Sequence, residues 1–307
     1  MNTISLDSIG RQKLTTGSFN QPIALSDGRL VTMEYPSFSG VFEAPGGDLP
    51  SIQARGFRLN ASGGAVNVSQ KQIFFSKHFD TDLEGIGIDS PSLALSLEQD
   101  VTPLGQSQIL KLDHSAATAA YHTIPNDVGT DGLFFRIYFK VDSLDADLQP
   151  IGLYTVFDSI DINFPAAAIR IKPNLDIIVR RGYDDLTVAG SGKITLGAWN
   201  RATIVVNGSD FTATVEQAIG GGYNNLFTSP QYTSSGAGLL SELSGLTEYV
   251  VGISSEGNAS HYVDTLEGYL TTGQSEVISP GQSYQYYCAR SLDEFNVTGA
   301  CTGYFWR

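Results

Sequence analysis

Residues 133–141 read LFFRIYFKV, and residues 199–206 read WNRATIVV. Both runs are rich in aromatic and β-branched residues, which favour strands. Shorter runs of the same kind lie between them, at 151–156, 168–171, 175–180 and 193–196. Turn-forming Gly, Asn, Asp and Pro cluster in the gaps, at 173–174, 182–185, 190–192 and 197. Short β-rich runs separated by such turns predict an antiparallel sandwich or barrel.

The rest of the chain extends this pattern on both sides. We expect further strands at 72–80, 93–97, 109–112, 211–216, 249–253 and 258–270. Residues 116–121 are small and could form a strand or a helical turn, and residues 239–246 are the best candidate for a short helix. On the two runs that open this section, period-2 alternation predicts that Phe135, Ile137, Phe139, Ile204 and Val206 point inward.

Composition narrows the class of protein. The 307 residues are 41% hydrophobic and only 16% charged, and they include 33 glycines. This suits a large all-β protein with many turns. The net charge of −14 argues against nucleic acid or an anionic membrane as a partner, because phosphates need Lys and Arg counterparts. We also expect no transmembrane helix and no secretion signal, since no long apolar run exists and residues 1–6 lack a basic start.

Residues 1–71 differ from the remainder. Their net charge is +1, against −15 for the rest, and their apolar residues are scattered among Gly, Ser, Pro and Asn. We expect an N-terminal arm or anchoring segment over 1–71, a main domain over 72–275 and an aromatic-rich C-terminal extension over 276–307. The arm could form an added sheet on the main domain or dock on another subunit. The arm buries too little of its own surface to offset chain entropy, so it must gain its order from one of these two partners. We favour another subunit, because the sandwich over 72–272 already has its full set of strands and residues 276–307 can cover what remains.

Six short motifs in the main domain resemble those of one fold family. They are Phe79 to Gly85, Gly105 to Leu112, Leu133 to Val141, Asn174 to Ile177, Gly197 to Ile204 and Tyr262 to Leu266. In this order they resemble the strands of concanavalin A-like lectin/glucanase domains, particularly the laminin-G-like ones. The resemblance covers about 72–272 and implies an all-β jelly roll of two antiparallel sheets, to which the arm and the extension are added.

The motifs of the enzymes with this fold are incomplete here. Their glycosidases carry Glu-x-Asp-x-Glu on one strand, and the nearest match is Ser159-Ile160-Asp161-Ile162-Asn163, which lacks both catalytic Glu. Alginate lyases of this fold use a Tyr-x-Lys motif, which Tyr138-Phe139-Lys140 imitates too early in the chain. We therefore assign no catalytic residue and expect a protein that is not an enzyme. A polysaccharide lyase or hydrolase with unfamiliar site residues is the less favoured alternative.

Other residues suggest binding. As a lectin-like domain, the chain would use Asp161 and Asn163 for hydrogen bonds to sugars and stack sugar rings on Tyr183, Trp199 and Tyr223. Chance similarity in a polar strand is the alternative reading of Asp161 and Asn163.

A metal site and a disulfide are also open. Many domains of this fold bind Ca²⁺, and Asp82, Glu84 and Asp264 match the position of the ligands, with the Gly105 carbonyl as a fourth. The alternative is that Asp82 and Glu84 only solvate a turn. The two cysteines, Cys288 and Cys301, could form a disulfide or remain two buried thiols.

The function that we favour from sequence is a virion structural protein of a bacteriophage, either a capsid decoration or tail-associated. Its partners would be other virion proteins or copies of itself, with cell-surface polysaccharide as a further ligand of the jelly roll. It would be located in the virion, which is assembled in the host cytoplasm. The alternative of a different class is a carbohydrate-binding adhesin or lectin module.

Overall fold

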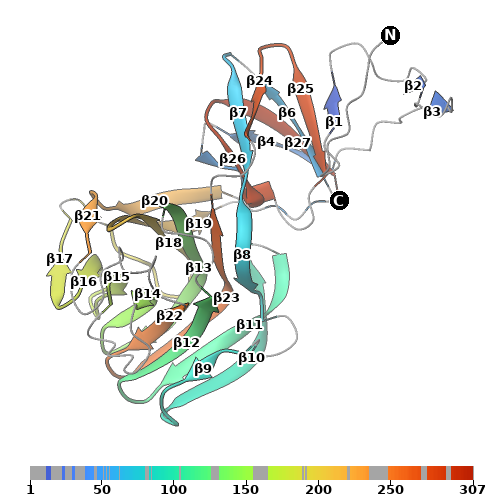
Figure 1. Ribbon diagram of the computed structural model, residues 1–307. Helices are drawn as coiled ribbons and strands as arrows, with labels where there is room; N and C mark the ends of the chain where they lie inside the picture. The colour runs from blue at the N-terminus through green and yellow to red at the C-terminus, as the bar shows by residue number, and fades with distance from the viewer. Residues whose placement is uncertain are drawn as a thin grey trace. The chain divides into compact units, whose positions relative to one another are not determined.

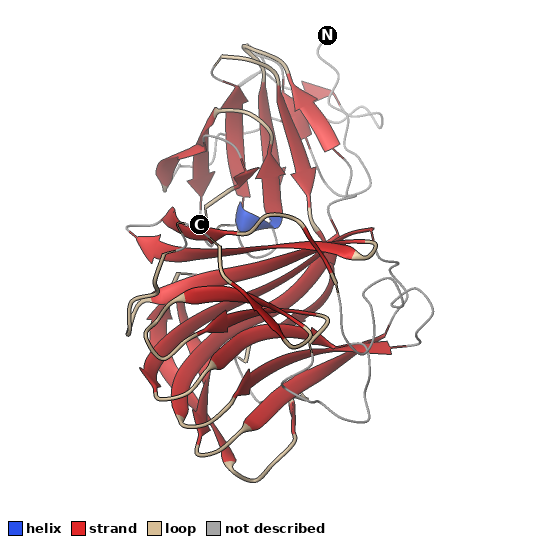
Figure 2. Cartoon of the chain, turned by 90° about the vertical axis from the view of Figure 1, so that its left-hand side faces the viewer, coloured by secondary structure: helices blue, strands red, loops and turns tan. Residues whose placement is uncertain are grey.

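The computed structural model covers residues 1–307 and is built almost entirely from β-strands (Figures 1 and 2). The residues that it describes are 12–14, 23–24, 30–31, 39–44, 47–50, 52, 54, 56–61, 63–79, 83, 85–103, 105–125, 131–154, 165–188, 190, 192–219, 222–234, 248–270, 275–287 and 292–306. Within these ranges the helical structure is a single 3₁₀ turn, Leu292–Glu294. No helix in the described part is long and apolar enough to cross a membrane.

The chain divides into two compact units. The jelly-roll unit is Gln72–Thr271, and the terminal unit combines Met1–Lys71 with Thr272–Arg307. In sequence, the jelly-roll unit is therefore an insertion between the two halves of the terminal unit.

The jelly-roll unit contains two antiparallel sheets. The nine-stranded sheet has the order β10-β11-β23-β13-β18-β19-β20, with β8 beside β23 and β21 beside β19. Its strands are β8 (Gln72–Lys77), β10 (Leu93–Thr102), β11 (Gly105–His114), β13 (Asp131–Leu144), β18 (Trp199–Asn207), β19 (Asp210–Ile219), β20 (Gly222–Thr228), β21 (Tyr232–Thr233) and β23 (Ala259–Leu270). The seven-stranded sheet has the order β17-β16-β15-β14-β22-β12-β9. Its strands are β9 (Gly87–Ile88), β12 (Thr118–Pro125), β14 (Leu148–Tyr154), β15 (Ala167–Ile171), β16 (Ile177–Arg181), β17 (Asp184–Leu186) and β22 (Glu248–Ser255).

The two sheets enclose one hydrophobic core. Alternate residues of β13 and β18 point into it, as the sequence predicts: Phe135, Ile137, Phe139, Ile204 and Val206 are all fully buried in this core. Ile151, Ile169, Val179 and Val251 contribute from the opposite sheet. The predicted all-β jelly-roll sandwich is therefore confirmed.

Most of the predicted strands are present, with local differences. Residues 116–121 lie largely in a strand, β12, and not in a helical turn. Residues 193–196 form no strand, and only an isolated bridge joins Lys193 to Asp176. The helix expected at 239–246 falls outside the described residues.

Strand β23 has two neighbours in succession along one edge. β11 pairs with it from Ala259 to Val263, and β8 pairs with it from Leu266 to Leu270. On the opposite edge of β23, the pairing with β13 is irregular between these two stretches. From Val263 to Leu266, β23 moves on by three residues while β13 moves by only two, between Phe139 and Ile137. This β-bulge marks the point where β11 leaves the sheet and β8 takes its place.

The terminal unit has a five-stranded sheet, β1-β25-β6-β27-β4, and a four-stranded sheet, β24-β7-β26-β5. Its strands are β1 (Gln12–Leu14), β4 (Gly40–Ala44), β5 (Gly47–Asp48), β6 (Gly56–Ala61), β7 (Val66–Gln70), β24 (Ser275–Ile278), β25 (Ser283–Tyr287), β26 (Phe295–Val297) and β27 (Cys301–Trp306); a separate pair is formed by β2 (Ile23–Ala24) and β3 (Leu30–Val31). Residues from both ends of the chain share one core, including Phe57, Leu59, Val68, Phe295 and Val297.

This arrangement corrects the expectation of a separate arm and extension. Strand β6 pairs with β25 and β27, and β7 pairs with β24 and β26, so the first segment is paired with the last one. Apolar residues between Phe42 and Val68 form one core with residues of the C-terminal segment. The described strands β6 and β7 of the first segment are thus paired within their own chain.

One of the two cysteines, Cys301, lies in the described part of the chain. Cys301 is a free, buried thiol in β27, and burial together with the charge of Glu43 raises its pKa to about 11. Such a thiol stays protonated and unreactive at neutral pH. Cys288 lies outside the described residues.

Two histidines are stacked in the interior of the jelly-roll unit. The rings of His114 in β11 and His261 in β23 are 5.2 Å apart and nearly parallel, at 10°. His114 Nδ1 is 2.6 Å from Thr118 Oγ1 of the other sheet, whereas His114 Nε2 and both ring nitrogens of His261 have no hydrogen-bond partner among the described residues. Burial lowers the pKa of His114 to about 4 despite the opposing charge of Asp113, and burial with the neighbouring His114 lowers that of His261 well below 6.5.

We expect this pair to make the fold acid-sensitive. Unfolded histidines take up protons near pH 6.5, while folded His114 stays neutral to about pH 4 and the pKa of folded His261 is also lowered well below 6.5. The stability that the neutral pair contributes is therefore present above pH 6.5 and is lost as the pH falls from there toward pH 4. Replacing His261→Phe should reduce the slope of unfolding free energy against pH by up to about 1.4 kcal/mol per pH unit. Urea unfolding between pH 7 and pH 4 measures this slope. An unchanged slope in the variant would contradict the assignment.

Candidate functional site

A row of alternating cations and aromatic rings crosses the outer face of the nine-stranded sheet. Because Phe139 points into the core, its neighbours Tyr138 and Lys140 point outward. Lys140 is opposite Trp199 of β18 on one side and Tyr262 of β23 on the other, and Tyr262 is opposite Lys111 of β11. Strand register thus places Lys111, Tyr262, Lys140 and Trp199 in one line across four strands, which we call the aromatic–cation row.

The members of this row are in contact. Lys140 Nζ lies 4.3 Å from the centre of the Tyr262 ring and 5.5 Å from that of Trp199, and Lys111 Nζ is 5.7 Å from the Tyr262 ring. These are cation–π distances. Trp199 and Tyr262 are 9% and 8% exposed, and they share a small cluster with Ile109 and Tyr138.

Arg201 extends the row at its β18 end. Its Nε and Nη2 atoms are both 2.8 Å from Glu216 Oε2, and its guanidinium lies 3.8 Å from the centre of the Tyr223 ring. Arg201 is only 5% exposed, and its Nη1 atom has no hydrogen-bond partner among the described residues. A buried guanidinium nitrogen without a partner among the described residues is a hydrogen-bond donor left unsatisfied.

The β10–β11 hairpin bends over this row. In the sheet, β10 is three strands away from β13, about 14 Å at the usual strand spacing. Yet Asp100 of β10 forms an ion pair with Lys140 of β13. β11 pairs with β23 only from Leu110 onward, so the segments Glu98–Thr102 and Gly105–Ile109 are paired with each other but not with β23. We call this end of the hairpin, Glu98–Thr102 together with Gly105–Ile109, the flap.

Electrostatics holds the flap residue Asp100 in its charged form. Burial acts to raise the pKa of this carboxyl, but hydrogen bonds from Lys140 and the Val101 amide, the charge of Lys140 and the nearby Trp199 indole outweigh it and lower the pKa. Asp100 is therefore paired with Lys140 as a carboxylate.

The structure brings together two of the predicted sugar-binding residues. Trp199 is in the aromatic–cation row, and Tyr223 packs against the same cluster through Arg201. Tyr183 belongs to the turn between β16 and β17 in the other sheet, so it lies apart from them. Asp161 and Asn163 fall outside the described residues, and their predicted role stays a prediction.

Sequence reasoning missed Lys140, Tyr262, Lys111 and Arg201. The alternation of Tyr138-Phe139-Lys140 indicates from sequence alone that Tyr138 and Lys140 share a face. The sequence does not indicate the cross-strand register that places Tyr262 and Trp199 beside Lys140.

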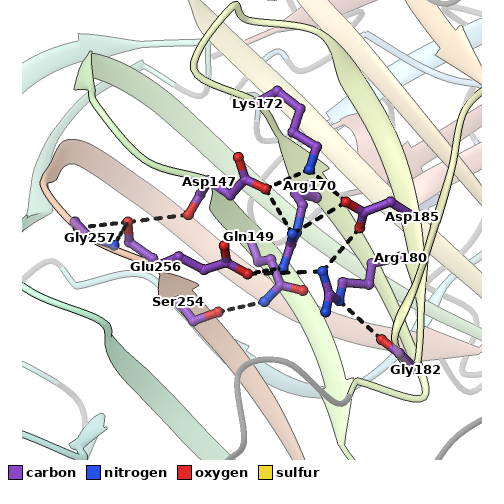
Figure 3. A network of polar contacts seen from close by, with 11 residues as sticks. Asp147, Gln149, Arg170, Lys172, Arg180, Gly182, Asp185, Ser254, Glu256 and Gly257 are labelled. Atoms are coloured by element: carbon purple, nitrogen blue, oxygen red, sulfur yellow. Dashed lines mark hydrogen bonds and ion pairs between the residues drawn. The ribbon is translucent and has the colours of Figure 1, made fainter.

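A second polar cluster covers the outer face of the seven-stranded sheet (Figure 3). Arg170 Nη1 is 2.8 Å from Asp147 Oδ2, and Arg170 Nη2 pairs with Glu256. Lys172 Nζ joins Asp147 Oδ2 at 2.7 Å to Asp185 Oδ2 at 2.6 Å. Arg180 Nη1 is 3.1 Å from Asp185 Oδ1. Three cations thus face three carboxylates in one connected network.

This network does not fit acid–base catalysis. Burial acts to raise the pKa of Asp185, but the hydrogen bond from Lys172 and the charges of Arg170, Lys172 and Arg180 outweigh it and lower the pKa. A glycosidase needs one carboxylic acid whose pKa is raised so that it can donate a proton. The pKa of Asp185 is instead lowered, and the other two carboxylates in Figure 3, Asp147 and Glu256, each form an ion pair with Arg170.

The same network supports the turn that carries Tyr183. Arg180 Nε donates to the Gly182 carbonyl at 3.0 Å, and the Gly182 amide donates to the Pro165 carbonyl at 2.8 Å. Tyr183 is 69% exposed at the tip of this turn. It is thus an exposed ring on a well-anchored turn, and its predicted contact with sugar would form a separate site.

The predicted Ca²⁺ site stays a prediction. Asp82 and Glu84 lie outside the described residues, while Asp264 is 2% exposed in the bulge of β23. Within the described part of the chain, no group of three or more His, Cys, Asp or Glu side chains could hold a metal ion.

No protein-family model and no curated protein matches this chain. Several solved structures are distantly similar. A protein of unknown function from Shewanella oneidensis MR-1 has a TM-score of 0.43 and 14% identity, covering 71% of this chain and 93% of that one. The CBM2 module of the evolved Dit of Lactobacillus casei BL23 phage J-1 has a TM-score of 0.41 and 11% identity, covering 67% and 99%. Peanut lectin has a TM-score of 0.37 and 10% identity, covering 67% and 98%. At these values the similarities assign no ligand, activity or partner to this chain.

Proposed function

We propose that the chain is a non-enzymatic, lectin-like protein whose jelly-roll unit binds carbohydrate on the outer face of the nine-stranded sheet. The observation that carries this proposal is the aromatic–cation row. It combines the flat apolar faces of Trp199 and Tyr262 with the donors of Lys140 and Arg201. Sugars present both an apolar ring face and hydroxyl groups, so a site for them combines aromatic rings with hydrogen-bonding side chains.

The polar network on the other sheet favours binding over catalysis. Its carboxylates form ion pairs with Arg170, Lys172 and Arg180, and the pKa of Asp185 is lowered, which is opposite to the raised pKa that the acid of a glycoside hydrolase needs. A lyase or hydrolase with unfamiliar residues is the less favoured function, and an assay for new reducing ends or unsaturated sugars would detect it.

We expect Trp199→Ala to weaken glycan binding by at least about tenfold, because truncating a central aromatic anchor typically costs more than 1.4 kcal/mol. Ile219→Ala, which shortens a side chain that is 57% exposed at the end of β19 in the same sheet, is the matched control and should bind normally. A glycan array followed by calorimetry on the best ligand provides the measurement.

Two results would contradict the proposed site. The first is a full array without any bound glycan. The second is binding that survives Trp199→Ala but is lost in Tyr183→Ala, which would move the site to the other sheet.

We further propose that the protein is a virion component, either a capsid decoration or a tail-associated protein, and an adhesin or lectin module outside a virion is the alternative. The strongly acidic net charge and the division into two units support this role. The terminal unit has its own core and could anchor the protein to other virion proteins or to copies of itself, while the inserted jelly roll is displayed.

Anchoring to copies of itself predicts that the full chain self-associates through the terminal unit. Light scattering after size-exclusion should find oligomers for residues 1–307 and monomers for residues 72–271, whose core is complete without the terminal unit. A full chain that stays monomeric at high concentration would contradict self-assembly, and equal oligomers of both would place the contact in the jelly roll.

A further inference from the structure

We propose that the ligand of the aromatic–cation row is an acidic sugar, one that carries a carboxylate, and that Asp100 of the flap occupies the place of this carboxylate in the free protein. This inference rests on the proposed function and specifies the ligand class of the same site. The aromatic–cation row is already assembled in the free protein, but Asp100 of the flap is paired with its central cation, Lys140.

The position above Lys140 is already that of a bound acid. The Lys140 ammonium lies between the rings of Trp199 and Tyr262 and is paired with the Asp100 carboxylate. The indole nitrogen of Trp199 is buried and has no hydrogen-bond partner among the described residues. A uronic acid bound here would place its carboxylate on the Lys140 ammonium, where Asp100 lies in the free protein.

Asp100 reaches this place only because the flap is free of the sheet. β23 pairs with β11 through Leu110–His114 and with β8 farther along, so Glu98–Thr102 and Gly105–Ile109 have no neighbour in β23. Moving this segment breaks no β-ladder hydrogen bond to β23. Ile109, at the base of the flap, is 1% exposed and packs with Tyr138, Trp199 and Tyr262, so the hinge lies at this residue and the part of the hairpin beyond it lifts to leave Lys140 to a ligand.

A second donor in the same cluster points to the same chemistry. Arg201 is 5% exposed, and its Nη1 atom has no partner among the described residues, although Nε and Nη2 are both satisfied by Glu216. A buried, unsatisfied guanidinium nitrogen favours an acceptor, and an acidic sugar supplies carboxylate and hydroxyl oxygens. Lys140 and Arg201 are on neighbouring strands, opposite Trp199 and Tyr138 respectively.

The net charge of the chain also bears on how an acidic ligand would bind. The chain has a net charge of −14, so an acidic polysaccharide meets a repulsive field at long range. Binding must then come from close contacts, and the Asp100–Lys140 pair limits it further by holding the ammonium. The flap acts as an internal competitor that selects for ligands able to displace it.

The test uses the full chain and two probes of equal length, oligogalacturonate and the neutral galacto-oligosaccharide. In calorimetry, the acidic probe should bind the native protein more tightly than the neutral one. Asp100→Asn should strengthen binding of the acidic probe by about fivefold, the factor expected when a competing, partly exposed ion pair is removed. Binding of the neutral probe should not change.

Charge variants at the row keep the test independent of folding defects. Lys140→Gln should lose binding of the acidic probe, and Lys140→Arg should keep it because the charge is retained. Lys193→Gln, which removes an exposed lysine of the jelly-roll unit that pairs with Asp176, is the control and should bind like the native protein.

The failures of the two proposals are distinguishable. If only the neutral probe binds, and Asp100→Asn and Lys140→Gln leave its affinity unchanged, the acidic-sugar inference is wrong while lectin-like binding stands. If both probes bind equally and neither variant matters, the inference is also wrong. If neither probe nor any arrayed glycan binds, both proposals fall together.

Discussion

The shared edge of β23 is the constraint on which the site depends. One strand of the nine-stranded sheet has β11 as its neighbour over its first half and β8 over its second half, with a bulge at Asp264 and Thr265 between them. Two strands cannot occupy the same edge, so β11 must leave the sheet where β8 enters. The released end of the β10–β11 hairpin then lies over the sheet face and delivers Asp100 to Lys140.

The two outer faces of the sandwich differ in the partners of their charged side chains. On the seven-stranded sheet, the cations and carboxylates of Figure 3 neutralise one another, and Arg170 is almost fully buried among its partners. Buried pairs of this kind are costly to break and contribute specificity of structure more than net stability. On the nine-stranded sheet, the cations face aromatic rings as well as acids, and Arg201 keeps one nitrogen without a partner among the described residues. The outer face of the seven-stranded sheet thus has a network that holds its own strands and turns together. The outer face of the nine-stranded sheet has the properties of a binding surface.

The fold was accessible from sequence where the information is local. Alternation in 133–141 and 199–206 identified the inward residues, because a strand side chain can face only one of two sides. The core of the terminal unit was not accessible, since Phe57 and Leu59 pack with Phe295 and Val297 across an insertion of 200 residues (Gln72–Thr271). Neither the N-terminal segment nor the C-terminal one alone contains a complete hydrophobic pattern, and for that reason the pattern of residues 1–71 predicts an arm.

The candidate site shows the same limit. Trp199 and Tyr223 were identified by residue type, but their neighbours Lys140, Tyr262 and Arg201 come from strands whose order and register are set by tertiary pairing. Residue type also suggested Tyr183, which the fold places on the opposite sheet. Local pattern therefore found candidate rings, and only the strand order determined which of them share a surface.

The most direct test of this account is a crystal structure of the full chain soaked with oligogalacturonate. We predict a sugar ring against Trp199, its carboxylate on Lys140 Nζ, and the flap lifted so that Asp100 no longer contacts Lys140. A sugar bound beside Tyr183 on the seven-stranded sheet, or a sugar elsewhere with the Asp100–Lys140 pair intact, would contradict it.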